Sequence, residues 1–229
     1  MTAGLLIVGS GGFGRETARA ALDGGYDGPL LGFLDDDPAR AGSIVGGVPV
    51  VGTLDALAEH PDAQVVVATG RPDDYTSRPR IVAHLGLPPE RYATIVHPGA
   101  HLAGDTLVGP GTVVLAGTVA TAGVRIGAHV AVMPQVVLTH DDVVDEFATL
   151  ASGVTLAGGV DVGRGAYVGA SSQVRQGLTL GAWSLVGMGS LILCDVPEAR
   201  IWFGRPAVDH GPSPVADLLA RGSTWKASA

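Results

Sequence analysis

The 229-residue chain is poor in cysteine, aromatic side chains and positive charge. Its single cysteine, Cys194, excludes a disulfide framework and a cysteine-rich metal site. Aromatic residues make up 5% of the chain, and 14 basic residues stand against 22 acidic ones, which gives a net charge of −8. Because nothing offsets repulsion from phosphate groups, we expect no binding to nucleic acid or to anionic membrane surfaces.

Long apolar runs are also missing. No stretch of about 18 apolar residues occurs, so the sequence predicts no membrane-spanning helix. The first ten residues, MTAGLLIVGS, lack the basic segment that opens a signal peptide and lead directly into a strand-like run. These features predict a protein of the cytoplasm.

Glycine, by contrast, is abundant, with 35 residues, and the second half of the chain repeats with a period of six. From Leu102 to Ile192, every sixth position is Leu, Ile or Val, with Ala120 as the one exception. A small or β-branched residue usually follows four positions after each of these. Because the phase never slips, chance does not explain the pattern.

This period indicates a β-helix, in which each six-residue unit forms one short strand and one turn. One aliphatic side chain per unit then points into a narrow core that all units share. The pattern resembles the hexapeptide repeat of left-handed parallel β-helix proteins, in which three hexapeptides build one triangular coil. On that resemblance, residues 102–192 form about five coils, and residues 18 positions apart stack on one another.

The first hundred residues follow a different rhythm. LLIVGSGGFGRETARAAL reads as a strand, a glycine turn and a helix, whereas PLLGFLDDDP and AQVVVATG read as two more strands. TLDALAEH and RPRIVAHLGL fit the helices between them. The alternation predicts a small Rossmann-like α/β domain with a parallel sheet. We therefore expect this domain over residues 1–96, the β-helix over 97–207, and a C-terminal tail over 208–229 that is either a short helix on the rim of an oligomer or frayed chain.

The glycine turn carries a phosphate-binding pattern. Gly9, Gly11 and Gly14 match G-x-G-x-x-G, and Asp35 and Asp36 follow about 20 residues later. Such glycines let the backbone approach phosphates, which the helix N-terminus attracts. A merely tight turn has the same glycines, but the order of strand, turn, helix and acid favours phosphate binding. A domain of roughly 95 residues is too short for both halves of a dinucleotide site, which favours a mononucleotide moiety over NAD.

The two parts, in this order, resemble the NeuD/PglD family of sugar acyltransferases, which includes sialic-acid O-acetyltransferases and UDP-4-amino-sugar N-acetyltransferases. The resemblance covers residues 1–207 and includes VGSGGFGRE, GFLDDDP, VPVVGTLDAL, VVVATG with Arg80 after it, and IVHPGA. It continues through HDDVVDEFATLASGVTLAGGVDVGRGAYVGASSQV and closes with FGRPA.

The resemblance implies a homotrimer whose α/β domain holds the nucleotide of a nucleotide-sugar. It implies that acetyl-CoA, the acyl donor, lies along the β-helix between neighbouring subunits, and that no metal is required. It also implies that His140 is the general base and Asp141 its partner. The implied acyl-CoA-binding residues are Gly158, Ala170, Gly187, Met188, Gly189 and Arg205. The implied nucleotide-sugar-binding residues are Gly9, Gly11, Gly12, Phe13, Gly14, Arg15, Asp35, Asp36 and Gly70.

The glycine turn departs from the family at two positions. The family often has a histidine and a lysine where this chain has Phe13 and Arg15. Phe13 offers no hydrogen bond to a sugar, whereas the planar guanidinium of Arg15 is able to pair with phosphate in a bidentate manner.

His140 alone among the seven histidines precedes two acids within the repeat. Stacking places it between Ala122 and Gly158, which leaves room for a ligand and exposes a Gly158 N–H that suits an oxyanion. Asp142 occupies a slot in which other repeats have a small or aliphatic residue, as expected where function overrides packing. A solvated outer turn is the alternative interpretation.

The sequence leaves several functions open. We expect transfer of an acetyl or larger acyl group from acyl-CoA to an amino group of a nucleotide-linked sugar, with a sugar hydroxyl as the alternative acceptor. A γ-carbonic-anhydrase-type metalloenzyme needs three histidines on zinc, and only His97 and His101 fall close together. A non-catalytic nucleotide-sugar binder would leave His140 inert, and an NAD-dependent enzyme needs a larger α/β domain.

Overall fold

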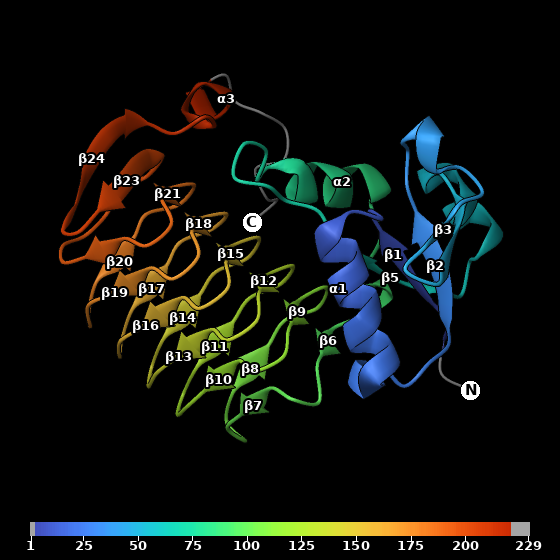
Figure 1. Ribbon diagram of the computed structural model, residues 1–229, viewed down its shortest axis with the longest axis horizontal. Helices are drawn as coiled ribbons and strands as arrows, with labels where there is room; N and C mark the ends of the chain where they lie inside the picture. Colours follow the sequence, from blue (N-terminus) through green and yellow to red (C-terminus); the bar gives the residue numbers. More distant parts are fainter. Residues whose placement is uncertain (1–2, 221–229) are drawn as a thin grey trace.

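A computed structural model describes residues 3–220 of the chain (Figure 1). The first part is a five-stranded sheet with the order β3–β4–β2–β1–β5, in which β3 is antiparallel to β4 and the other pairs are parallel. Its elements are β1 (Leu5–Val8), α1 (Gly12–Ala20), η1 (Ala21–Gly25), β2 (Leu30–Leu34), η2 (Pro38–Arg40), β3 (Ile44–Val45), β4 (Val48–Gly52), η3 (Leu54–Glu59), β5 (Gln64–Val67), α2 (Ser77–Leu85) and η4 (Pro89–Arg91).

Both faces of this sheet are covered, which explains why β1 is apolar at every position. Leu5 and Ile7 pack on the α1 side, and Leu6 and Val8 pack on the α2 side. This alternation is typical of a parallel strand that is buried on both faces. The three strands predicted from sequence are β1, β2 and β5. The β3–β4 hairpin was not predicted.

The helix expected over TLDALAEH is the short 3₁₀ helix η3, which ends at Glu59. His60 follows it and stands directly before Pro61. The residue before a proline is disfavoured in the α conformation, so the segment does not extend into an α-helix.

The second part is the β-helix, whose parallel strands form three faces. Face 1 contains β7 (His101–Leu102), β10 (Val119–Ala120), β13 (Val137–Leu138), β16 (Thr155–Leu156), β19 (Gln173–Val174) and β22 (Leu191–Ile192). Face 2 contains β8 (Leu107–Val108), β11 (Arg125–Ile126), β14 (Val143–Val144), β17 (Asp161–Val162) and β20 (Thr179–Leu180). Face 3 contains β6 (Ile95–Val96), β9 (Val113–Val114), β12 (Ala131–Val132), β15 (Thr149–Leu150), β18 (Tyr167–Val168), β21 (Leu185–Val186), β23 (Arg200–Gly204) and β24 (Ala207–Pro212).

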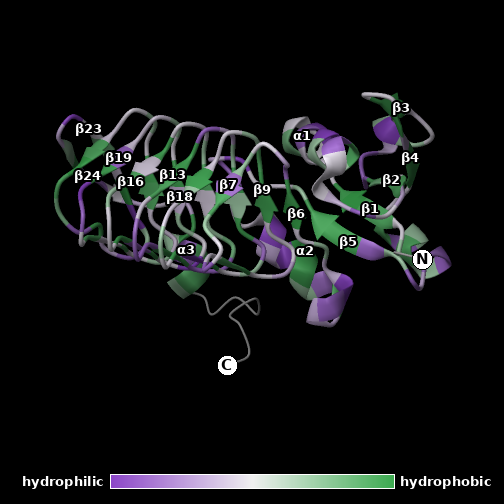
Figure 2. Cartoon of the chain, turned by 90° about the horizontal axis from the view of Figure 1, so that it is seen from below, coloured by the Kyte–Doolittle hydropathy of each residue, from purple (hydrophilic) through white to green (hydrophobic). Residues whose placement is uncertain are grey.

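The six-residue period is the structural unit of these faces. The second residue of each strand from β7 to β22 is the aliphatic position of the repeat, and strands that begin 18 residues apart pair in register. These side chains form one continuous apolar core along the β-helix. Figure 2 shows hydrophobic strands joined by paler, more polar turns. The predicted fold class, an α/β domain followed by a left-handed β-helix, is therefore confirmed.

The corners between faces are where the two parts of the molecule meet. We name them corner 1/2, corner 2/3 and corner 3/1 after the faces they join. At corner 2/3, the buried Arg78 of α2 donates to the carbonyl oxygens of Phe147 (2.8 Å) and Ala148 (3.0 Å). At the same corner, the Tyr75 hydroxyl donates to the Trp183 carbonyl at 2.9 Å. The α/β part is thus held against corner 2/3, and Figure 1 shows α2 beside that side of the β-helix.

The end of the described chain also packs at this corner. β24 pairs with β23 in antiparallel orientation, the Ser213 hydroxyl donates to the Trp183 carbonyl, and α3 (Ala216–Ala220) follows. The predicted tail begins at residue 208, inside β24, and its residues 221–229 lie outside the described part. Within residues 3–220, no helix is both long and apolar enough to cross a membrane.

Candidate functional site

A cleft of about 570 Å³ opens at the carboxyl edge of the parallel sheet. It is lined by the turns that follow β1 and β5, together with acids that follow β2. In the order β3–β4–β2–β1–β5, the strands β2 to β4 lie on one side of β1 and β5 lies on its other side. The point between β1 and β5 is therefore a topological switch point. Ligands of open α/β sheets bind at such a switch point, outside the carboxyl ends of the strands. The cleft therefore lies where a nucleotide is expected.

Six of the nine predicted nucleotide-sugar residues line this cleft: Gly9, Gly11, Gly12, Phe13, Asp35 and Gly70. A Cβ atom on Gly11 or Gly12 would meet no atom within 4 Å, so the backbone is bare towards the cleft. Gly9 and Gly70 have positive φ angles of 95° and 131°, a conformation that favours glycine. The turn therefore leaves its backbone open to the cleft.

The other three predicted residues lie outside the cleft lining and have different contacts. A Cβ on Gly14 would lie 1.9 Å from the Gly9 carbonyl oxygen, so this glycine allows α1 to pack closely on the turn. Arg15 is exposed beside Gly46, in the turn between β3 and β4. Asp36 accepts the Leu54 N–H at 2.9 Å and thereby holds the start of η3.

Asp35 stabilises the glycine turn after β1 through hydrogen bonds to its side chain. Its Oδ2 accepts both the N–H (2.8 Å) and the hydroxyl (2.5 Å) of Ser10, and its Oδ1 accepts the Asp37 N–H at 3.0 Å. Partial burial opposes ionisation, but these hydrogen bonds outweigh it and hold the pKa of Asp35 below its usual value. Asp35 is thus an ionised residue at the cleft wall, largely occupied in fixing the glycine turn.

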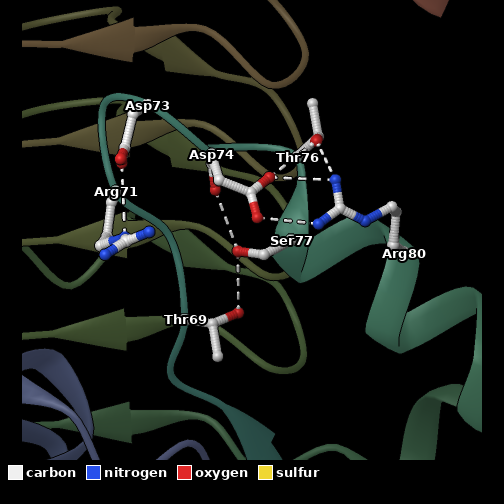
Figure 3. A network of polar contacts seen from close by, with 7 residues as sticks. All are labelled: Thr69, Arg71, Asp73, Asp74, Thr76, Ser77 and Arg80. Atoms are coloured by element: carbon white, nitrogen blue, oxygen red, sulfur yellow. Dashed lines mark hydrogen bonds and ion pairs between the residues drawn. The ribbon is translucent and has the colours of Figure 1, made fainter.

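The far wall of the cleft consists of residues that the sequence reasoning missed (Figure 3). Its lining residues Thr69, Arg71, Asp74 and Ser77 belong to the loop between β5 and α2 or to the first turn of α2. Arg71 and Asp74 exchange backbone hydrogen bonds, which closes a tight turn. The position of this loop after a parallel strand at the switch point was the available signal.

An ion pair ties this wall to helix α2. Arg80 donates from both terminal nitrogens to Asp74, at 3.0 and 2.8 Å (Figure 3). Partial burial opposes ionisation of Asp74, but the bonds from Arg80 dominate and keep the pKa of this carboxyl below its usual value. Arg71 pairs with Asp73 at 3.3 Å on the exposed side of the loop. The wall thus offers both a carboxylate and a guanidinium near the cleft mouth.

The proposed general base lies elsewhere, on corner 1/2 of the β-helix. The Nδ1 of His140 is 3.0 Å from Oδ2 of Asp141, and both side chains are mostly exposed, at 68% and 76%. Asp141 has a φ angle of 62°, the left-handed conformation that the tight turn requires. When Asp141 accepts the Nδ1–H, the lone pair of the imidazole is on Nε2. The pair then has the arrangement of a base with its orienting carboxylate.

Gly158 lies directly beneath this imidazole. A Cβ on Gly158 would be 2.3 Å from Nε2 of His140, so only glycine lets the ring occupy this position. The Gly158 carbonyl accepts the Gly177 N–H, while the next residue, Gly159, donates its N–H to the His140 carbonyl. The predicted stacking of His140 on Gly158 agrees with these contacts.

The remaining predicted acyl-CoA residues gather at a different corner. Ala170, Gly187, Met188 and Gly189 belong to the turns of corner 3/1, and Met188 is 78% exposed. Arg205 joins them by donating to the Gly189 carbonyl at 3.3 Å. Face 1 separates this group from His140 and Gly158 of the same chain.

Two other histidines have local partners that account for them. His129 is buried at corner 2/3, stacked on Phe147 and edge-on to Tyr92, and burial lowers its pKa to about 4. His97 accepts the Gly99 N–H on Nδ1 and contacts Asp23 through Nε2 at 3.4 Å. Within the described residues, no three His, Cys, Asp or Glu side chains group to hold a metal ion.

Comparison with known proteins agrees with this two-part architecture. Residues 4–84 match the family model of the PglD N-terminal domain. Among curated proteins, none matches the chain.

Several solved structures match nearly the whole chain. The acetyltransferase domain of PglB from Neisseria gonorrhoeae FA1090, solved with acetyl coenzyme A, is 26% identical, with a TM-score of 0.81 over 92% of this chain and 100% of that one. A mutant of perosamine N-acetyltransferase from Caulobacter crescentus, solved with CoA and GDP-perosamine, is 28% identical, with a TM-score of 0.82 over 92% and 98%. WeeI from Acinetobacter baumannii AYE shares the fold at 22% identity, with a TM-score of 0.79 over 91% and 100%.

The match to the N-terminal family model, the cleft at the switch point of the sheet and the β-helix with its His–Asp turn all agree with the resemblance to sugar acyltransferases of the NeuD/PglD family. Residues 4–84 thus carry the PglD N-terminal domain, and over nearly its whole length the chain is similar to a perosamine N-acetyltransferase and to an acetyltransferase domain that were solved with CoA or acetyl coenzyme A.

Proposed function

We propose that the protein transfers an acetyl or larger acyl group from acyl-CoA to an amino group of a nucleotide-linked sugar in the cytoplasm. The observation that carries this proposal is the contact of His140 Nδ1 with Asp141 Oδ2, with Nε2 above the bare Gly158. Nε2 accepts the proton of the attacking amine as the new bond to the thioester carbon forms. The Asp141 carboxylate fixes the tautomer and stabilises the imidazolium.

The Gly158 N–H is the proposed donor to the thioester oxygen as it becomes negative. Gly158 has no side chain of its own to cover this N–H, and within the described residues the N–H donates to no backbone acceptor. Collapse of the tetrahedral intermediate expels the CoA thiolate, which takes up the proton from His140. No covalent acyl-enzyme is needed, and no residue of this chain has to act as a nucleophile.

The substrate amine is proposed to come from the cleft in the α/β part. Its bare glycine turn suits the phosphates of the nucleotide, since backbone N–H groups and the start of α1 favour negative charge. A hydroxyl acceptor is the alternative. The amine is favoured because the similar perosamine N-acetyltransferase was solved with GDP-perosamine, an amino-sugar nucleotide.

Assembly into a homotrimer would unite these separated groups. The cleft lies beside corner 2/3, His140 lies on corner 1/2, and Met188 and Arg205 lie at corner 3/1. A closed threefold ring brings unlike corners of neighbouring subunits together. We therefore place each active site between two subunits, with acyl-CoA contacting both.

A product assay tests the activity. Purified protein is incubated with acetyl-CoA and a panel of UDP-, dTDP- and GDP-linked amino sugars, and products are weighed by mass spectrometry. We expect one acetyl group added to an amino sugar, and a 10²–10⁴-fold loss of kcat in His140→Ala. Asp141→Asn should cost less, because it keeps the shape and one acceptor. Full turnover by His140→Ala would overturn the mechanism.

A further inference from the structure

The hydrogen bonds of the β-helix change at one place, the turn that carries His140. Elsewhere on corner 1/2, the residue after each face 1 strand from β7 to β19 donates its N–H to the coil above. Thr121 donates to the Leu138 carbonyl, and Ala157 to the Val174 carbonyl, both at 3.0 Å. Ala103 and Arg175 make the equivalent bonds. Thr139 is the one residue of this series, within the described chain, whose N–H does not follow the rule.

The Thr139 N–H instead donates to Oδ2 of Asp142, at 2.8 Å. The Thr139 hydroxyl replaces it as the donor to the Leu156 carbonyl, at 3.0 Å. The other oxygen of Asp142, Oδ1, accepts the Val160 N–H of the next coil at 2.9 Å. The side chains of Thr139 and Asp142 therefore replace one backbone hydrogen bond. These two residues flank His140 and Asp141 in the chain.

Asp142 is an unusual residue for this position. Its side chain points into the core with no exposed surface, between Val124 and Val160 in the same column of the corner. Burial raises the pKa of its carboxyl to about 6, although the two N–H groups oppose this effect. At equivalent positions of the other corners, hydroxyls do part of the same work, since Thr112 accepts the Val130 N–H at 3.0 Å. The hydroxyl at that position accepts a hydrogen bond from the next coil, and the Asp142 carboxylate accepts a second one from Thr139 of its own turn.

We propose that Asp142 and Thr139 form a clamp that positions the His140 imidazole above Gly158, a role that rests on the proposed function. The clamp closes the turn from Thr139 to Asp142 and fixes the backbone directions of the two residues between them. The His140 ring has little freedom, because Nε2 lies where a Cβ of Gly158 would be. Without the clamp, the Thr139 N–H is free to bond the Leu156 carbonyl, as its counterparts do. The base of the turn, and with it the ring, then shifts.

Asp142 and Thr139 are positioning residues in this proposal, since neither needs to touch substrate. A misplacement of a catalytic group by about 1 Å is able to cost roughly 10²-fold in rate. We therefore expect the clamp to affect kcat while leaving the KM for acyl-CoA nearly unchanged. A residue that only stabilised the fold would change the melting temperature and the amount of active enzyme, but not the pH and rate properties of each correctly folded site.

The experiment compares Thr139→Val, Thr139→Ser, Asp142→Ala and Asp142→Asn with Thr121→Val as the matched control. Thr121 occupies the position of Thr139 one coil earlier, and its N–H makes the ordinary bond. Active sites are counted by calorimetric titration with CoA, so that kcat refers to folded protein. We expect kcat to fall about 10–100-fold in Asp142→Ala and less in Thr139→Val. Thr139→Ser and Thr121→Val should retain wild-type kcat.

The outcomes separate this proposal from the proposed function. If Asp142→Ala and Thr139→Val bind CoA and turn over at the wild-type rate while His140→Ala is inactive, the clamp is refuted and the general base stands. Equal losses in Thr121→Val and Thr139→Val would also refute the clamp. If Asp142→Ala fails to fold, Thr139→Val against Thr139→Ser decides the question, because the first variant removes the hydroxyl and the second retains it.

Discussion

Arg78 of helix α2 donates a 2.8 Å hydrogen bond to the backbone carbonyl of Phe147, 69 residues later in the β-helix. Its guanidinium also reaches Thr69 and Thr149 and is fully buried, and this burial lowers the pKa of Arg78 to about 10. Arg78→Met keeps much of the volume but leaves buried acceptors without a donor. We expect a loss of about 2–4 kcal/mol in the free energy of unfolding, measured by urea denaturation.

Arg80 provides the matched control on the same helix. It pairs with Asp74 but is about half exposed, and exposed ion pairs contribute less than about 1 kcal/mol. Arg80→Met should therefore change stability much less than Arg78→Met. Similar losses in both variants would show that Arg78 is not the anchor between the two parts.

Two neighbouring glycines should respond in opposite ways. Gly12 lines the cleft, and a Cβ there meets no atom within 4 Å, so in Gly12→Val stability should hold while nucleotide-sugar affinity falls. Gly14→Ala places a Cβ 1.9 Å from the Gly9 carbonyl oxygen, so it should destabilise the fold. Calorimetric titration with nucleotide-sugar and with CoA, together with thermal unfolding, checks both. Loss of CoA binding in Gly12→Val equal to that of nucleotide-sugar would indicate misfolding instead.

Gly158→Ala tests the stacking of the imidazole on its neighbour. The new methyl would occupy the place of His140 Nε2, so we expect kcat to fall about 10–100-fold through displacement of the base. Gly104 is at the same corner, three coils before Gly158, and a Cβ there meets nothing within 4 Å. Gly104→Ala should leave kcat unchanged. Steady-state rates of a Gly158→Ala variant equal to those of Gly104→Ala would contradict the position of the ring.

Mixed trimers test whether one active site draws on two subunits. Gly12→Val impairs nucleotide-sugar binding in the cleft and His140→Ala removes the base, so each variant alone should have little activity. When the two are co-expressed, about a quarter of the sites in randomly mixed trimers combine an intact cleft with an intact base from a neighbour. We expect that fraction of the wild-type rate, and a trimer by light scattering. No recovery in a verified hybrid would place both groups in the same chain.

The pH dependence of stability tests the burial of Asp142. Its pKa in the folded protein is raised from 3.8 to about 6, chiefly by burial. A group with a raised folded pKa contributes stability that is fully present below its unfolded pKa and is lost as the pH rises through the folded value. Between pH 4 and pH 7, wild type should therefore lose up to about 2 kcal/mol relative to Asp142→Asn. Urea unfolding that shows a constant difference across this range would contradict the raised pKa.

The fold was predictable because its signals are local and repeated. Each aliphatic residue of the six-residue period contacts the next coil in the same way, so the pattern from Leu102 to Ile192 determines the β-helix. The glycine turn was predictable for a similar reason, since strand, turn and helix are adjacent in sequence. His140 and Asp141 are chain neighbours, and Gly158 follows one stacking period later, so this group also appears in the sequence.

Only the tertiary structure decided how these parts face one another. Asp74 and Ser77 line the cleft because β5 lies on the opposite side of β1 from β2. No short sequence pattern marks that change in strand order. The α/β part lies against corner 2/3 because Arg78 finds acceptors there, a match of individual side chains and carbonyls. The role of Asp142 depends on the Thr139 N–H, which donates to the Asp142 carboxylate and not to the Leu156 carbonyl of the next coil. Sequence periodicity describes what all coils share, whereas a single exchanged hydrogen bond exists only in the assembled fold.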